Sequence, residues 1–84
     1  VEKKGVEEIA EALKVNRVLQ VLDLHGNRIS EGVQLIADSL KFNASLQILK
    51  ISSNYINDDG VLSIAQGLKF NECLQLLDLS SNFL

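Results

Sequence analysis

A six-residue segment that recurs at a nearly constant spacing constrains the fold of this chain more than any other feature. Its three copies, LQVLDL, LQILKI and LQLLDL, begin at residues 19, 46 and 74, a period of about 28 residues. Each copy runs on to an asparagine and then to an aliphatic residue two positions later. A fixed period of this length is the signature of a solenoid, in which each repeat packs only on its neighbours.

The period divides the 84 residues into one domain, 1–84, with two whole repeats and two partial ones. We expect a helical half-repeat at 1–18, whole repeats at 19–45 and 46–73, and a strand half-repeat at 74–84. A solenoid segment with polar caps at neither end should be a piece of a longer array, or should associate with copies of itself through its ends.

Each repeat combines two hydrophobic periods. Leu22 and Leu24 alternate with other residues, as in a β-strand, whereas residues 33–40 place apolar residues three and four positions apart, as in a helix. A strand, helix, strand order requires parallel strands. Parallel strands are about 4.8 Å apart and packed helices roughly 8–10 Å, so the stack should curve with its strands on the concave side. The fold class is therefore an α/β solenoid.

The motif Leu-x-x-Leu-x-Leu-x-x-Asn-x-Ile, with a helical second half, resembles the leucine-rich repeat family in its ribonuclease-inhibitor-like subclass, which includes the repeat arms of NOD-like receptors. The resemblance covers essentially the whole chain. It implies a curved horseshoe segment with parallel strands on the concave face and helices on the convex face. It also implies a protein-binding role, without choosing among immune sensing, GTPase regulation, cytoskeletal and scaffolding roles.

Equivalent positions in the repeats predict structural columns. The recurring leucines should form the core, and Val15, Phe42 and Phe70 should stack repeat on repeat at the helix exits. Asparagine side chains should satisfy backbone groups where the chain leaves each strand, at Asn27, Asn54 and Asn82.

Helix ends carry their own signals. Ser30 and Asn57 fit N-caps, and the asparagines that follow each helix (Asn16, Asn43 and Asn71) fit left-handed C-terminal caps.

The side chains left for function project from the concave strand face. Three of them, Arg28, Tyr55 and Phe83, form a column of a guanidinium and two aromatic rings, the composition of interface anchors. Charged residues of alternating sign occupy neighbouring strands, and their electrostatic attraction would fix how a partner lies on this face. The predicted partner-binding set is Asp23, His25, Arg28, Lys50, Ser52, Tyr55, Asp78 and Phe83.

Asp23, His25 and Ser52 also suggest a hydrolytic triad, but a shallow strand surface lacks an oxyanion hole and a water-excluding pocket. We therefore predict no enzymatic activity and no catalytic residues. A lone histidine does not make a metal site. Glycines that recur at the repeat period are close-packing positions rather than a phosphate-binding loop, so no cofactor is expected.

Composition limits the classes of partner and the cellular compartments that we expect for this protein. A net charge of −3 argues against nucleic acid. The apolar runs are too short to span a membrane, and no signal peptide is visible. A single cysteine, Cys73, suggests a reducing compartment, so we expect a cytoplasmic protein.

These patterns predict a protein-protein interaction module that binds a protein partner through its concave face. The alternative is an architectural spacer of a longer solenoid with no ligand of its own.

Overall fold

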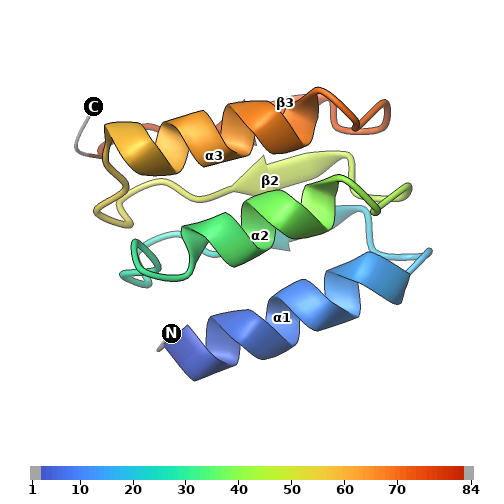
Figure 1. Cartoon of the computed structure of the whole chain (residues 1–84), viewed down its shortest axis with the longest axis horizontal. Coiled ribbons are helices and arrows are strands. Elements are labelled where there is room, and N and C mark those ends of the chain that lie inside the picture. The colour runs from blue at the N-terminus through green and yellow to red at the C-terminus, as the bar shows by residue number, and fades with distance from the viewer. Residues whose placement is uncertain (1–2, 83–84) are drawn as a thin grey trace.

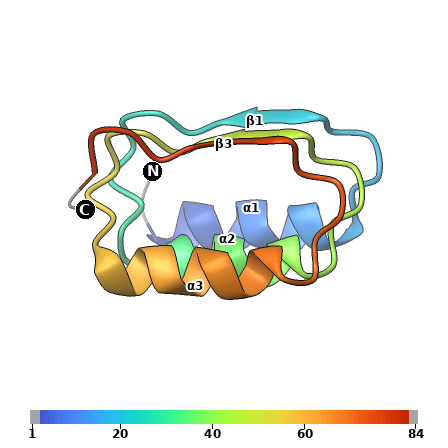
Figure 2. The same ribbon diagram turned by 90° about the horizontal axis from the view of Figure 1, so that it is seen from above.

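The computed structural model describes residues 3–82, which form a layer of three helices and a layer of three strands (Figures 1 and 2). The predicted Phe83 anchor lies outside the described residues. The elements in chain order are α1 (Lys3–Val15), β1 (Val21–Asp23), α2 (Val33–Leu40), β2 (Ile48–Lys50), α3 (Asp58–Leu68) and β3 (Leu76–Asp78).

The strands form one parallel sheet in the order β1-β2-β3, as the repeat predicts. The register aligns equivalent positions, so that Val21 lies beside Ile48 and Ile48 beside Leu76. All three strands end on one side of the molecule and all three helices end on the other (Figure 1). Positions one repeat apart are therefore neighbours in space.

The core lies between the two layers and is densest in the middle of the stack. Leu46, Leu49 and Ile51 of the central repeat are fully buried. Leu22 and Leu77, which align with Leu49 in the outer strands, are only half-buried. The difference follows from the stack itself, because within the described residues each outer strand has a neighbour on one side only.

Two glycines allow the helices to approach closely. A Cβ on Gly32 would lie 2.7 Å from a methyl group of Val6, which confirms that this repeating glycine is a close-packing position. The backbone carbonyl of Ala37 blocks a Cβ on Gly67 even more severely. At this second position the α2–α3 contact excludes any side chain.

The apolar column of Val15, Phe42 and Phe70, predicted to stack repeat on repeat, is largely exposed. Their side chains are 75%, 61% and 66% exposed. Each residue lies where its helix ends and the chain turns toward the next strand, so the side chain points past the edge of the two layers. Leu13 and Leu40, two residues earlier, fill the core at this end.

The two predicted N-caps differ in outcome. Asn57 has an extended backbone, and its Oδ1 accepts a hydrogen bond from the Gly60 N–H at 3.0 Å, so it caps α3 as predicted. Ser30 does not cap α2: the helix begins at Val33, and its N-cap, Gly32, forms no side-chain cap bond. A turn over residues 30–32 shifts the helix start away from the serine.

The predicted left-handed caps at Asn16, Asn43 and Asn71 are also wrong. Helices α2 and α3 end in right-handed residues, Lys41 and Lys69. The non-glycine residues with positive φ among those described are Arg28, Ser53, Tyr55 and Ser81. The left-handed turns therefore follow the strands and not the helices.

No helix within residues 3–82 is both long and apolar enough to cross a bilayer.

Candidate functional site

A ladder of asparagines holds the loops that follow the strands. Asn54 is fully buried, and its Oδ1 accepts hydrogen bonds from the backbone N–H groups of Asn27 (2.8 Å) and Ile29 (3.2 Å). Its Nδ2 donates to the carbonyl oxygens of Leu24 and Ser52, both at 2.9 Å. One side chain thus joins two consecutive loops, as the sequence predicts.

Asn82 repeats this arrangement one step further along the stack. Its Oδ1 accepts from the N–H groups of Asn54 (2.7 Å) and Ile56 (3.0 Å), and its Nδ2 donates to the Ile51 carbonyl at 3.0 Å. The loops are therefore tied to one another from repeat to repeat, which fixes the side chains that they present.

A second ladder, which the sequence analysis missed, joins the turns that follow the helices. Asn43 donates from Nδ2 to the Leu13 carbonyl at 2.8 Å, and Asn71 donates to the Leu40 carbonyl at 2.9 Å. Each Oδ1 accepts from backbone N–H groups two and three residues later in its own turn, for example from the Leu46 N–H at 2.7 Å. The recurrence of these asparagines one repeat apart was the available signal, but it was assigned to the wrong backbone conformation.

The strand face carries the predicted charges side by side. Asp23 aligns with Lys50, and Lys50 with Asp78, so a cation lies between two carboxylates. Within the described residues the ion pairs shorter than 4.0 Å are Lys14–Glu11 and Lys41–Asp38, so the ammonium of Lys50 is not committed to either neighbour. It remains available to solvent or to a partner.

Asp78 has a lowered pKa. The main cause is the Ser80 hydroxyl, which donates to Asp78 Oδ1 at 2.7 Å, followed by the Ser80 backbone N–H at 3.0 Å. The positive charge of Lys50 adds to the effect. This carboxylate is therefore held in its charged form on the strand face.

The structure brings His25 and Ser52 together but does not build a triad from them. Nδ1 of His25 lies 2.6 Å from Oγ of Ser52, as the repeat register predicts. The carboxylate of Asp23 instead accepts a hydrogen bond from the backbone N–H of His25 at 3.0 Å. The imidazole is exposed, whereas Ser52 is only 7% exposed, so the histidine of this pair faces solvent and covers the serine hydroxyl.

Arg28 and Tyr55 are neighbours in the loops that follow β1 and β2. The Arg28 guanidinium carbon lies 5.6 Å from the centre of the Tyr55 ring, within the range of a cation–π contact. Both residues have positive φ, 55° and 61°, which is rare for large side chains and is sustained only when the surroundings impose it. The asparagine ladder runs through these same loops and supplies that constraint.

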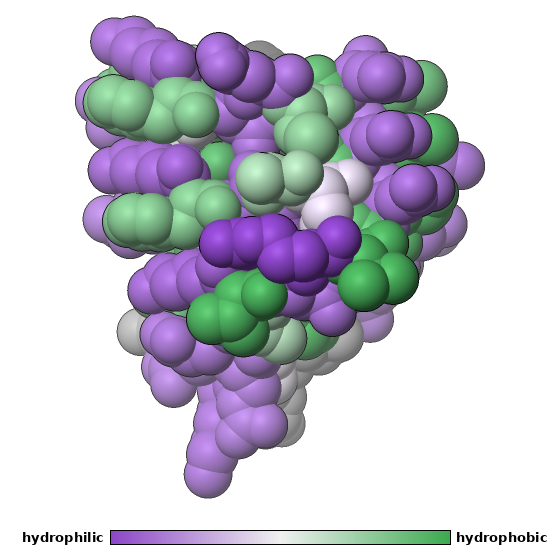
Figure 3. Space-filling view, turned by 90° about the vertical axis from the view of Figure 1, so that its right-hand side faces the viewer, coloured by the Kyte–Doolittle hydropathy of each residue, from purple (hydrophilic) through white to green (hydrophobic). Residues whose placement is uncertain are grey.

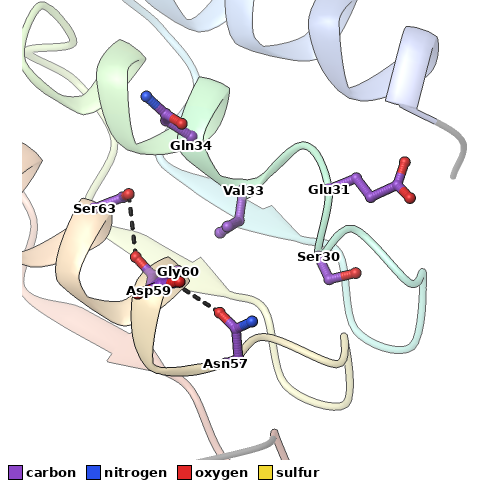
Figure 4. Close-up of a pocket in the computed structure, with 8 residues that line it drawn as sticks. All are labelled: Ser30, Glu31, Val33, Gln34, Asn57, Asp59, Gly60 and Ser63. Carbon is purple, nitrogen blue, oxygen red and sulfur yellow. Dashed lines mark hydrogen bonds between the residues drawn. The ribbon is translucent and has the colours of Figure 1, made fainter.

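A shallow depression of about 210 Å³ lies between the starts of α2 and α3 (Figure 4). Two of its polar side chains already serve the local fold: Asn57 caps α3, and the Ser63 hydroxyl donates to the Asp59 carbonyl at 3.2 Å. Nothing in its lining arranges chemistry toward a ligand. Over residues 3–82, no three histidine, cysteine, aspartate or glutamate side chains come together as metal ligands.

The fold and the ladders define the class of protein: a parallel α/β repeat solenoid whose helices cover one face of the sheet and whose other face is open. Two family models match consecutive segments, "Leucine Rich Repeat" at residues 18–41 and "Leucine Rich repeat" at residues 42–65, which together span more than half of the chain. The chain belongs to the leucine-rich repeat family.

A comparison with curated protein sequences found no match. Among solved structures, the chain is similar to "Leiomodin-1 Actin-Binding Site 2 (ABS2)", with a TM-score of 0.92 and 28% sequence identity. The similarity covers 98% of this chain and 48% of that one, so this chain spans about half the length of its structural neighbour. The family and this neighbour are typical of non-enzymatic protein-interaction modules, which agrees with the predicted class of function.

Proposed function

We propose that this chain binds a protein partner through its strand face, the surface formed by the outward side chains of β1, β2 and β3 and of the loops that follow them. Helices cover the opposite face of the sheet, so this face is the one open to a partner (Figure 2). Exposed apolar side chains, Val21 and Leu76, lie on it beside the charged row of Asp23, Lys50 and Asp78. Mixed apolar and charged surfaces of this kind are common in interfaces between proteins.

The observation that carries the proposal is the Arg28–Tyr55 pair. Arginine and tyrosine are enriched among the residues that dominate binding energy. Here the ring is 45% exposed, and both residues are held in backbone conformations that cost free energy. The asparagine ladder holds the loops of this pair in place and leaves the tyrosine exposed, so the pair is ready for a contact, and Phe83 would extend it.

Actin is the first partner to test, because the structural neighbour is an actin-binding site. We place the protein in the reducing cytoplasm, where the half-buried thiol of Cys73 would stay free. We also retain the ribonuclease-inhibitor-like subclass for this repeat, because its period of about 28 residues and helical second half persist through the chain.

The proposal also includes association of copies through the sheet edges. Within the described residues β1 and β3 each pair on one side only, and open strand edges favour pairing with another chain. Sedimentation velocity over a series of concentrations would detect this, and a monomer at every concentration would contradict it.

The decisive experiment compares two double variants in capture from lysate and in binding to purified actin. Lys50→Glu with Tyr55→Ala removes a cation and a ring from the strand face. The control, called the α3 variant, combines Leu62→Ala in α3 with Lys4→Glu in α1, a matched change at exposed positions that belong to neither proposed surface. Circular dichroism melts should show that both variants stay folded.

We expect the strand-face variant to lose a specific partner that the wild-type chain and the α3 variant retain. Equal capture by all three proteins would contradict the proposal and favour the alternative, in which the segment is an architectural spacer. Binding to actin that survives the strand-face changes would show that actin is held elsewhere on the molecule.

A further inference from the structure

An apolar surface without a structural role lies at the helix-exit edge, which we define as the edge where the three helices end. Its exposed apolar side chains are Val15, Val18, Phe42 and Phe70. Figure 3 looks onto this edge and shows hydrophobic side chains standing out among hydrophilic ones. Exposed apolar residues that gather in this way mark interaction sites more often than scattered ones do.

The turns that carry these side chains are held firmly. The second asparagine ladder runs directly beside them, because Asn43 follows Phe42 and Asn71 follows Phe70. The Lys41 ammonium also lies 5.9 Å from the centre of the Phe70 ring. The edge is therefore preorganised, so a partner would meet little cost in ordering it.

The same edge is richer in cations than the rest of this acidic chain. Lys14, Lys41 and Lys69 each precede an apolar residue of the edge, and Arg17 lies beside Val18. Lys14 and Lys41 have carboxylate partners, whereas the Arg17 guanidinium donates to a backbone carbonyl. Within the described residues Arg17 and Lys69 form no ion pair, so they would attract an acidic partner.

The spacing of the edge indicates the shape of that partner. Val15, Phe42 and Phe70 lie at the ends of successive packed helices, whose axes are roughly 8–10 Å apart. Seven residues of an α-helix rise about 10.5 Å. A partner helix lying across the helix ends would therefore place an apolar residue beside each repeat once in every seven positions.

We propose that the helix-exit edge is a second docking surface, and that its occupant is an acidic amphipathic α-helix of another protein. The apolar face of that helix would lie on Val15, Phe42 and Phe70, and its carboxylates would meet Arg17 and Lys69. Glu11 and Asp38 at this edge are already paired with Lys14 and Lys41. The regular spacing of the apolar side chains suits a helix, whereas a lipid bilayer would need no such spacing.

The test titrates the intact chain with a synthetic helix of three heptads that has leucine at every seventh position and glutamates beside it. Two-dimensional NMR should show shifts confined to residues 14–18, 41–44 and 69–72. In fluorescence polarisation, Phe42→Ser with Phe70→Ser should weaken binding by about tenfold or more, as expected for the loss of central apolar anchors. Both positions are exposed, so the variant should remain folded.

Val21→Ser with Leu76→Ser removes exposed apolar side chains from the strand face instead and should leave binding of the synthetic helix unchanged. No binding, binding with shifts on the strand face, or equal loss in both variants would overturn the proposal. Binding to phosphatidylserine vesicles, but not to the helix, would replace the proposed occupant with a membrane. The proposal is independent of the strand-face proposal, because each has its own variant and its own shifted residues.

Discussion

At the scale of single residues, one amino-acid type carries much of the organisation of this protein. Asparagine offers a donor and an acceptor on one short side chain, so it can satisfy a carbonyl and an N–H at the same time. Asn54 and Asn82 use this capacity after the strands, and Asn43 and Asn71 use it after the helices. Both edges of the solenoid are thus fixed by side chains that join neighbouring repeats.

Asn54→Ala should lower the free energy of unfolding by about 1–3 kcal/mol, because buried backbone groups of two loops lose their partners. Urea denaturation would measure the change. Ser53→Ala, at the preceding half-buried position, serves as a control and should have little effect. An Asn54→Ala variant with an unchanged denaturation midpoint would contradict the ladder.

Ser80→Ala should raise the pKa of Asp78 toward its ordinary value, because it removes the hydroxyl that donates to the carboxylate. NMR titration of the side-chain carboxyl carbon would follow this. The native pKa is depressed, so the contribution of Asp78 to stability is present above its unfolded-state pKa and is lost as the pH falls through the folded-state value. Ser80→Ala should therefore cost stability near neutral pH and almost none in strong acid.

Ser81→Ala provides the comparison, since no hydrogen bond joins that hydroxyl to Asp78. An Asp78 pKa that is the same in the native chain and in Ser80→Ala would show that the serine does not hold the carboxylate.

At the scale of the elements, local signals fix the type of each segment more firmly than its ends. The alternating leucines and the helical stripe correctly indicate strands and helices, and the structure gives the strands three residues and the helices 8 to 13. The helix ends differ because capping depends on where the chain can turn. At α3, Asn57 lies next to the first helical residue, whereas Ser30 lies three residues before α2 begins.

Asn57→Ala should destabilise the chain by about 1 kcal/mol, the usual cost of losing an N-cap. Ser30→Ala, at the equivalent-looking position of the preceding repeat, should cost almost nothing because Gly32 occupies the cap. Thermal melts of the two variants would compare them directly. Equal losses in both would mean that Ser30 stabilises the start of α2 after all.

At the scale of the whole molecule, stability comes from neighbouring repeats and rises toward the middle of the stack. The central leucines are fully buried, and the equivalent residues of the outer strands are partly open. The same leucine therefore contributes different amounts at different places in one sheet.

Leu49→Ala should cost about 2–5 kcal/mol, and Leu77→Ala distinctly less, because the side chain of Leu77 is only half-buried. A domain of this length has a total stability of only about 4–13 kcal/mol, so Leu49→Ala brings the chain close to unfolding. Denaturant titrations of both variants give the comparison. Equal costs would indicate that the outer strand is covered in solution, as association through the sheet edges would do.

The amino-acid sequence by itself determined the solenoid, the parallel register and the asparagine ladder of the strand loops. A period of about 28 residues brings equivalent positions side by side wherever each helix or strand begins and ends. The sequence could therefore predict that His25 meets Ser52 and that Arg28 lies beside Tyr55. It could not determine where side chains point at the ends of elements. The recurring apolar character of Phe42 and Phe70 predicted a column at the helix exits, but only the tertiary structure decided that this column is left in solvent.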